Sequence, residues 1–141
     1  MTERAKLAVS GAKTALDKIR VMLELMADDL VTSQESVRLM AQFDAIYARE
    51  WPVERLLTLE AQVCPGVFQQ FTALVREGIA EGSLRSDLNP SLTLHAVRNA
   101  VVGAQRRLAS LRSRVELEYG HPIDSLFRET IRILLLGMRA T

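Results

Sequence analysis

Hydrophobic residues recur three and four positions apart along most of the chain, which is the spacing of one face of an α-helix. In the first such stripe, Leu16, Ile19, Leu23, Met26 and Leu30 follow one another in this rhythm. Later stripes keep it over comparable lengths. The pattern predicts about six helices, whose apolar stripes cover residues 16–30, 37–47, 53–63, 67–79, 94–111 and 123–138.

Proline, glycine and cap residues mark the expected helix boundaries. Thr32, followed three residues later by Glu35, matches a capping box and predicts that the second helix starts there. Asn89 is a good cap residue directly before Pro90, and proline suits the first helical position. Further breaks are expected at Trp51-Pro52, at Cys64-Pro65-Gly66, at Gly82 and at Tyr119-Gly120-His121-Pro122.

The same pattern determines the fold class and the domain organisation. No segment alternates apolar and polar residues over the length of a strand without also fitting helical spacing, so we expect an all-α, antiparallel helical bundle. A chain of 141 residues fits one domain, and no internal repeat or long linker divides it. We therefore predict a single helical domain over 1–141, with residues 1–12 as a lead-in or a frayed segment because Gly11 weakens helix formation there.

Composition and charge narrow the classes of function. The formal net charge is +1, from 18 basic and 17 acidic residues, so the overall charge does not indicate a nucleic-acid-binding surface. Cys64 is the only cysteine, which excludes an internal disulfide. The charged residues near Met1 do not form a signal peptide, and no apolar run approaches the roughly 18 residues of a membrane span. We expect a soluble, cytoplasmic protein.

The search for catalytic chemistry is negative. The sequence has no glycine-rich phosphate loop, no nucleophile elbow and no His-Glu-x-x-His pair. His121 lies in a turn, and His95 lies near a helix start, where a hydrogen-bonded structural histidine is the simpler interpretation and a pocket residue is the alternative. Cys64 has no adjacent cationic cluster that would lower its pKa. We expect no enzyme activity, no metal and no cofactor.

Methionine and aromatic residues of the first half form the candidate ligand site. Such side chains give adaptable apolar cavity walls with a few polar tips, although an ordinary core uses the same residues. Asp44 either sits at the edge of an apolar helix face, reaching water or an arginine, or anchors a ligand inside a cavity. The candidate ligand-binding residues are Met22, Met26, Met40, Phe43, Asp44, Tyr47, Trp51, Phe68, Phe71 and His95.

The second half carries a recognisable series of elements. The segment 71–92, which reads FTALVREGIAEGSLRSDLNPSL, contains a helix ending at Gly78-Ile79 and Gly82, then Leu84-Arg85, Asp87 and Pro90. The next helix has a small-residue face with Ala96, Ala100 and Gly103, and the closing segment 126–138 contains Leu-Leu-Leu-Gly-Met. Together these elements resemble the C-terminal domain of TetR-family transcriptional regulators, with coverage from about Leu16 to the end.

The resemblance implies a bundle whose last two long helices pair with those of a twin subunit in a four-helix interface. It also implies a cavity for a small apolar effector, whose binding controls DNA binding by a separate N-terminal domain. The family's helix-turn-helix has no counterpart in residues 1–32, so the chain is either part of a longer protein or a free-standing relative that cannot bind DNA in the family's way. The expected dimer interface comprises Val97, Val101, Ala104, Leu108, Phe127, Ile131, Leu134 and Met138.

The sequence thus favours the ligand-sensing and dimerisation domain of a TetR-type regulator. Its expected partners are a second copy of itself, a small apolar effector and DNA, the last only through the missing domain, and no membrane. The alternative is a helical protein–protein interaction module that binds no ligand. An enzyme built on a helical bundle would need a cluster of polar catalytic side chains, and we find no such cluster in the sequence.

Overall fold

The computed structural model describes residues 9–47, 50–63, 66–111 and 113–141, and these are almost entirely helical. Within them, the one extended pairing is an isolated bridge between Leu84 and Arg139, so the predicted all-α class is confirmed. None of the described helices has the length and apolar content needed to cross a membrane. Val9 and Ser10 are helical and precede α2 (Ala15–Thr32), α3 (Gln34–Tyr47), α4 (Val53–Val63), α5 (Val67–Glu81), α6 (Pro90–Leu111), α7 (Arg114–Tyr119) and α8 (Ile123–Met138).

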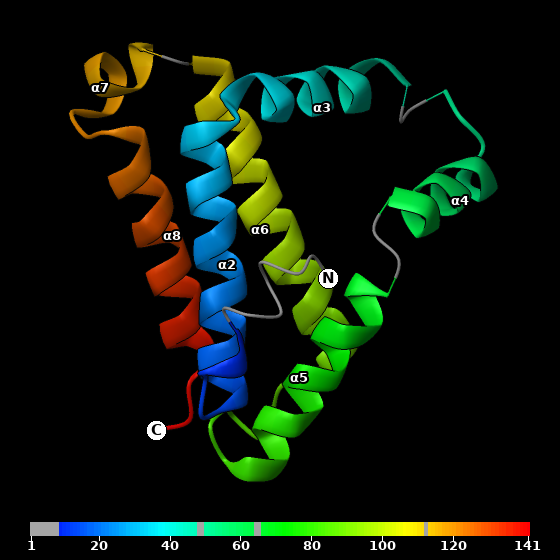
Figure 1. Cartoon of the computed structure of the whole chain (residues 1–141), viewed down its shortest axis with the longest axis vertical. Coiled ribbons are helices and arrows are strands. Elements are labelled where there is room, and N and C mark those ends of the chain that lie inside the picture. Colours follow the sequence, from blue (N-terminus) through cyan, green and yellow to red (C-terminus); the bar gives the residue numbers. More distant parts are fainter. Residues whose placement is uncertain (1–8, 48–49, 64–65, 112) are drawn as a thin grey trace.

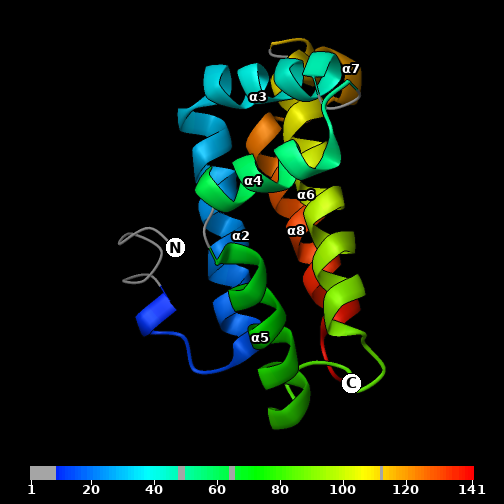
Figure 2. The ribbon, with the colours of Figure 1, turned by 90° about the vertical axis from the view of Figure 1, so that its right-hand side faces the viewer.

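The long helices α2, α6 and α8 stand side by side, and α5 packs against α2 and α6 (Figure 1). Helices α2 and α8 run in opposite directions, so the start of α2 lies beside the end of α8. Helix α3 crosses the opposite end of this bundle and packs on α6, as the turned view also shows (Figure 2). Helix α4 lies away from the α2–α8 pair in Figure 1 and joins α3 to the side of the bundle that holds α5.

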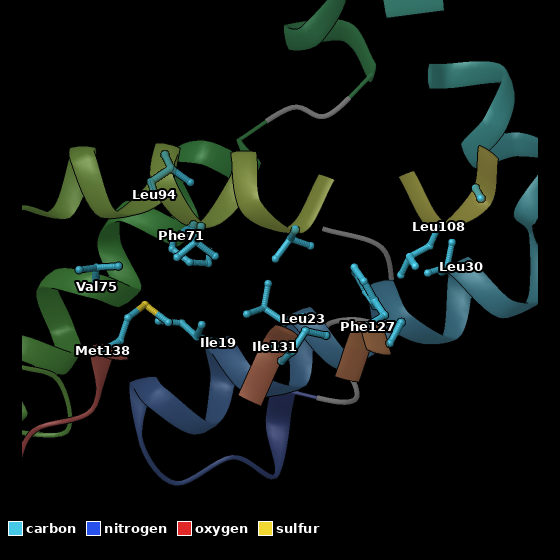
Figure 3. Packing of buried hydrophobic residues seen from close by; sticks show 14 of the residues in the cluster. Ile19, Leu23, Leu30, Phe71, Val75, Leu94, Leu108, Phe127, Ile131 and Met138 are labelled. Atoms are coloured by element: carbon cyan, nitrogen blue, oxygen red, sulfur yellow. The ribbon is translucent and has the colours of Figure 1, made fainter. Parts of the chain in front are cut away.

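The apolar stripes predicted from the sequence form the core between these helices (Figure 3). On α2, the spacing of three and four residues places Ile19, Leu23 and Leu30 on the buried face, as predicted. The stripes of the other long helices meet this face. The core comprises Ile19, Leu23, Ala27 and Leu30 from α2, Phe71 and Val75 from α5, Leu94, Val97, Val101, Leu108 and Ala109 from α6, and Phe127, Ile131 and Met138 from α8, together with Leu84 and Val115.

Most of the predicted helix boundaries are present, and the predicted cap at Thr32 is wrong. The side chain of Asn89 accepts a hydrogen bond of 3.0 Å from the Leu92 amide, and Gly82 ends α5 with a φ of 79°. Thr32 does not cap α3, because it is the last residue of α2 and its hydroxyl donates to the Asp28 carbonyl at 2.9 Å. The break between α2 and α3 lies at Ser33, next to the predicted position, but Thr32 belongs to α2, which is buried through Leu30.

The loop after α5 closes the end of the bundle where α2 begins and α8 ends. The Leu84 amide donates to the Gly78 carbonyl at 2.9 Å, and the Arg85 amide donates to the Met138 carbonyl at 3.0 Å. The Leu84 side chain is 1% exposed and lies against Gly78, where a side chain would not fit. This loop therefore joins the end of α5 to the end of α8 through both backbone and side chain.

Candidate functional site

The residues predicted to line a ligand cavity fall into separate parts of the structure. Phe71 is buried in the core, and Met22 and Met26 are half-buried and packed against it. Met40 is exposed on α3, and His95 is exposed on α6, outside the core. The side chains of Asp44, Tyr47 and Phe68, and all of Cys64, lie outside the described part of the structure.

A second group of the predicted residues forms an aromatic corner between α3 and α4. The rings of Phe43 and Trp51 lie edge to face, with centroids 5.3 Å apart and an interplanar angle of 89°. The guanidinium carbon of Arg55, in the first turn of α4, lies 4.0 Å from the centroid of the Trp51 ring. These contacts hold the start of α4 to the end of α3. Phe43 and Trp51 therefore stabilise this corner. Met22, Met26 and Phe71 belong instead to the core or pack against it.

A buried glutamine in the middle of the bundle was missed by the sequence reasoning. Gln105 of α6 is buried, and its side-chain amide donates a hydrogen bond of 2.9 Å to the Met26 carbonyl on α2. A buried polar group needs such a partner, so the bond fixes the register of α6 against α2. The signal was present in the sequence, because Gln105 interrupts the apolar stripe between Val101 and Leu108.

The residues predicted for the dimer interface occupy the core of a single chain. Ala104 and Leu134 are half-buried, and the other six are buried against neighbouring helices of the same chain. Since a second subunit cannot reach these six, a dimer face on α6 and α8 would have to use the opposite sides of both helices. The six buried residues are Val97, Val101, Leu108, Phe127, Ile131 and Met138.

The sides of α6 and α8 turned away from the core carry small and apolar residues, which we call the outer face: Leu92, Ala96 and Gly103 on α6, and Ile133 and Gly137 on α8. All five are exposed, and the two helices pack on each other. A Cβ atom added at Gly103 or Gly137 would meet no other atom within 4 Å, and neither residue has a positive φ. The fold of one chain therefore does not require glycine at either position.

A surface ion pair joins α8 to α2. The Arg128 guanidinium lies 2.9 Å from Asp28 of α2 and 2.8 Å from Asp124 of α8. The hydrogen bond to Asp28, followed by that to Asp124, raises the pKa of Arg128 above its ordinary value. On α6, burial lowers the pKa of the Arg106 guanidinium.

Within the described residues, no group of three or more histidine, cysteine or acidic side chains is arranged to hold a metal ion.

Comparison of the chain with protein-family models, curated proteins and solved structures gives no match. The functional argument therefore depends on the chain's own geometry. The exposed outer face of α6 and α8 and the corner that connects α3 to α4 both bear on that argument.

Proposed function

We propose that this chain is the ligand-sensing and dimerisation domain of a TetR-type transcriptional regulator. The observation that carries the proposal is the pair of glycines on the outer face, Gly103 and Gly137. Glycine inside a helix costs roughly 0.5–1 kcal/mol relative to alanine, and within the described part of the chain no close contact requires glycine at either position. Close approach of a second subunit's helices explains both residues.

A symmetric dimer through the outer face fits the shape of the bundle. The helices α6 and α8 of each subunit would form a four-helix interface around a twofold axis. Ala96 and Gly103 are seven residues apart, which places two small residues on one side of α6 and lets a facing helix come near its backbone. Leu92 and Ile133, both exposed in one chain, would supply the apolar contact area.

We place effector binding away from the outer face, at the part of the bundle where α3 and α4 attach. A small apolar effector that separates α3 from the α2–α6 pair would bring Met22 and Met26 into contact with it, and methionine adapts easily to irregular ligands. Such a ligand shifts the population of bundle conformations only by its difference in affinity for them. Dimerisation would transmit that shift to two DNA-binding domains outside this sequence.

An interaction module without an effector is the second candidate, because α3 and α4 expose large apolar side chains. Leu39 and Ile46 on α3 and Val53 and Leu57 on α4 are all more than half exposed. Exposed apolar surface of this kind is typical of protein–protein contact sites. Under this alternative the chain would bind a different protein through α3 and α4, and saturating amounts of small apolar compounds would leave its thermal stability unchanged.

The dimer is tested by placing a charge on the outer face. Ile133 is 58% exposed in the single chain, so Ile133→Glu should leave the fold intact but weaken a dimer by at least about tenfold, because it buries an unpaired carboxylate. Sedimentation velocity over a range of concentrations measures the change. Leu117→Glu is the matched control, since Leu117 lies on α7 and is 88% exposed. If both variants sediment like the wild type, the outer face is not the interface.

Replacing Gly103 with alanine separates the requirements of the fold from those of the dimer. In the single chain the added methyl group meets open space, so stability of the subunit should rise by about 0.5–1 kcal/mol. In the dimer the same methyl group would separate the facing helices and weaken association by about tenfold. Urea unfolding measures the first effect and sedimentation measures the second. A gain in stability with unchanged association would show that Gly103 does not face a subunit.

A further inference from the structure

A depression of about 580 Å³ lies at the end of the bundle where α2 begins and α8 ends. This volume falls within the ordinary range for small-molecule sites. The first turns of α2, the Gly82–Ser83 loop and the last turns of α8 form its walls, together with the residues that follow α8. Its lining combines the apolar side chains of Leu16, Leu135 and Leu136 with the cationic side chains of Arg20, Arg132 and Arg139, and it also contains Thr14 and the Asp17 carboxylate that pairs with Arg20.

The three arginines differ in how their charges are compensated. Arg20 pairs with Asp17 at 2.8 Å and Arg132 pairs with Glu129 at 2.6 Å, in each case one helical turn away. Exposed pairs of this kind add little to stability, so both guanidinium groups can exchange their partners for a ligand at small cost. Arg139 is exposed, and its guanidinium has no hydrogen bond or ion pair within the part of the chain that the structure describes.

The apolar part of the depression is partly open to solvent. Leu16 and Leu135 are half-buried and pack against the core, whereas Leu136 is 53% exposed. An exposed leucine beside an unpaired guanidinium gives a site with one apolar side and one cationic side. Its complement is a molecule with an alkyl group at one end and an anionic group at the other.

We propose that this depression binds a small amphiphilic carboxylate. Its alkyl chain would lie on Leu16, Leu135 and Leu136, and its carboxylate would accept charge-assisted hydrogen bonds from Arg139, with Arg132 next to it. None of these residues belongs to the outer face of α6 and α8. The inference therefore does not depend on dimerisation or on effector sensing near α3.

Titration of the whole chain with sodium octanoate, followed by amide NMR shifts, tests the site. Octanoate should shift the amides of Leu16, Leu136 and Arg139 in a saturable way. Arg139→Gln should weaken octanoate binding by about tenfold, which is the usual contribution of one charge-assisted hydrogen bond. Arg114→Gln, on the exposed surface of α7, removes the same charge elsewhere and should leave the affinity unchanged.

Two further probes separate the parts of the proposal. Acetate lacks the alkyl chain and 1-octanol lacks the charge, so each should bind at least about tenfold more weakly than octanoate. Leu136→Ser should weaken octanoate binding without changing the fold, because the side chain is exposed. The proposal is overturned if octanoate shifts other regions, if 1-octanol or acetate binds as tightly, or if Arg139→Gln binds octanoate like the wild type.

Discussion

Replacing Phe127 with alanine is expected to lower the free energy of unfolding by about 3–5 kcal/mol. Phe127 of α8 is 0% exposed and is the largest fully buried side chain among the residues that the structure describes. It lies near Leu30 of α2 and Leu108 of α6, where three helices meet (Figure 3). The helix backbones on all sides prevent the resulting cavity from collapsing, so both transfer and packing energy are lost.

Urea unfolding followed by circular dichroism measures this effect for Phe127→Ala. The control is Leu117→Ala, at a side chain that is 88% exposed, and its unfolding midpoint should match the wild type. A loss below about 1 kcal/mol at Phe127 would mean that α8 does not pack into the core as described.

Replacing Gly78 with alanine is expected to destabilise the chain by about 1–3 kcal/mol, although alanine normally favours a helix. A Cβ atom at this position would lie 2.6 Å from Cγ and Cδ1 of Leu84 and 3.2 Å from Cβ of Ala15. Leu84 cannot move away easily, because its amide donates to the Gly78 carbonyl and its side chain is buried. The clash therefore opposes the loop that closes this end of the bundle.

A double-mutant cycle identifies the clash as the cause. Leu84→Ala alone leaves a cavity and should also destabilise the chain, but the Gly78→Ala/Leu84→Ala pair should lose less than the sum of the two single changes. The methyl group added at Gly78 fills part of the space that Leu84 vacates. Strict additivity of the two losses in urea unfolding would contradict this contact.

Helical spacing was sufficient to predict the fold class and most of the helices. The apolar stripe in residues 16–30 is the buried face of α2, because apolar side chains with helical spacing lie on one side of a helix and that side packs into the core. The short helix α7 was not predicted, since six residues with Val115 as the one buried side chain are too few to establish a period. Thr32 and Glu35 resemble a cap, but Thr32 is the last residue of α2 and its hydroxyl bonds back to the Asp28 carbonyl.

The candidate sites were harder to predict, for a physical reason. An apolar stripe facing the chain's own core and one facing a second subunit have the same spacing, so Val101 and Phe127 looked equally suited to either. Of the small residues noted as a separate face of the helix over 94–111, Ala96 and Gly103 remain exposed, whereas Ala100 is half-buried. The contact of Phe43 with Trp51 depends on the path of the chain between α3 and α4, which residue spacing does not encode.

Sedimentation equilibrium of the unmodified chain tests the proposed role most directly, because a subunit that joins two DNA-binding domains must associate with a copy of itself. One chain has a mass of 15.8 kDa. The outer face predicts a species of twice that mass at micromolar concentrations, which dissociates when Ile133 is replaced by glutamate. A mass of one chain at every concentration, with both glycines of the outer face exposed to solvent, would contradict the proposed dimer.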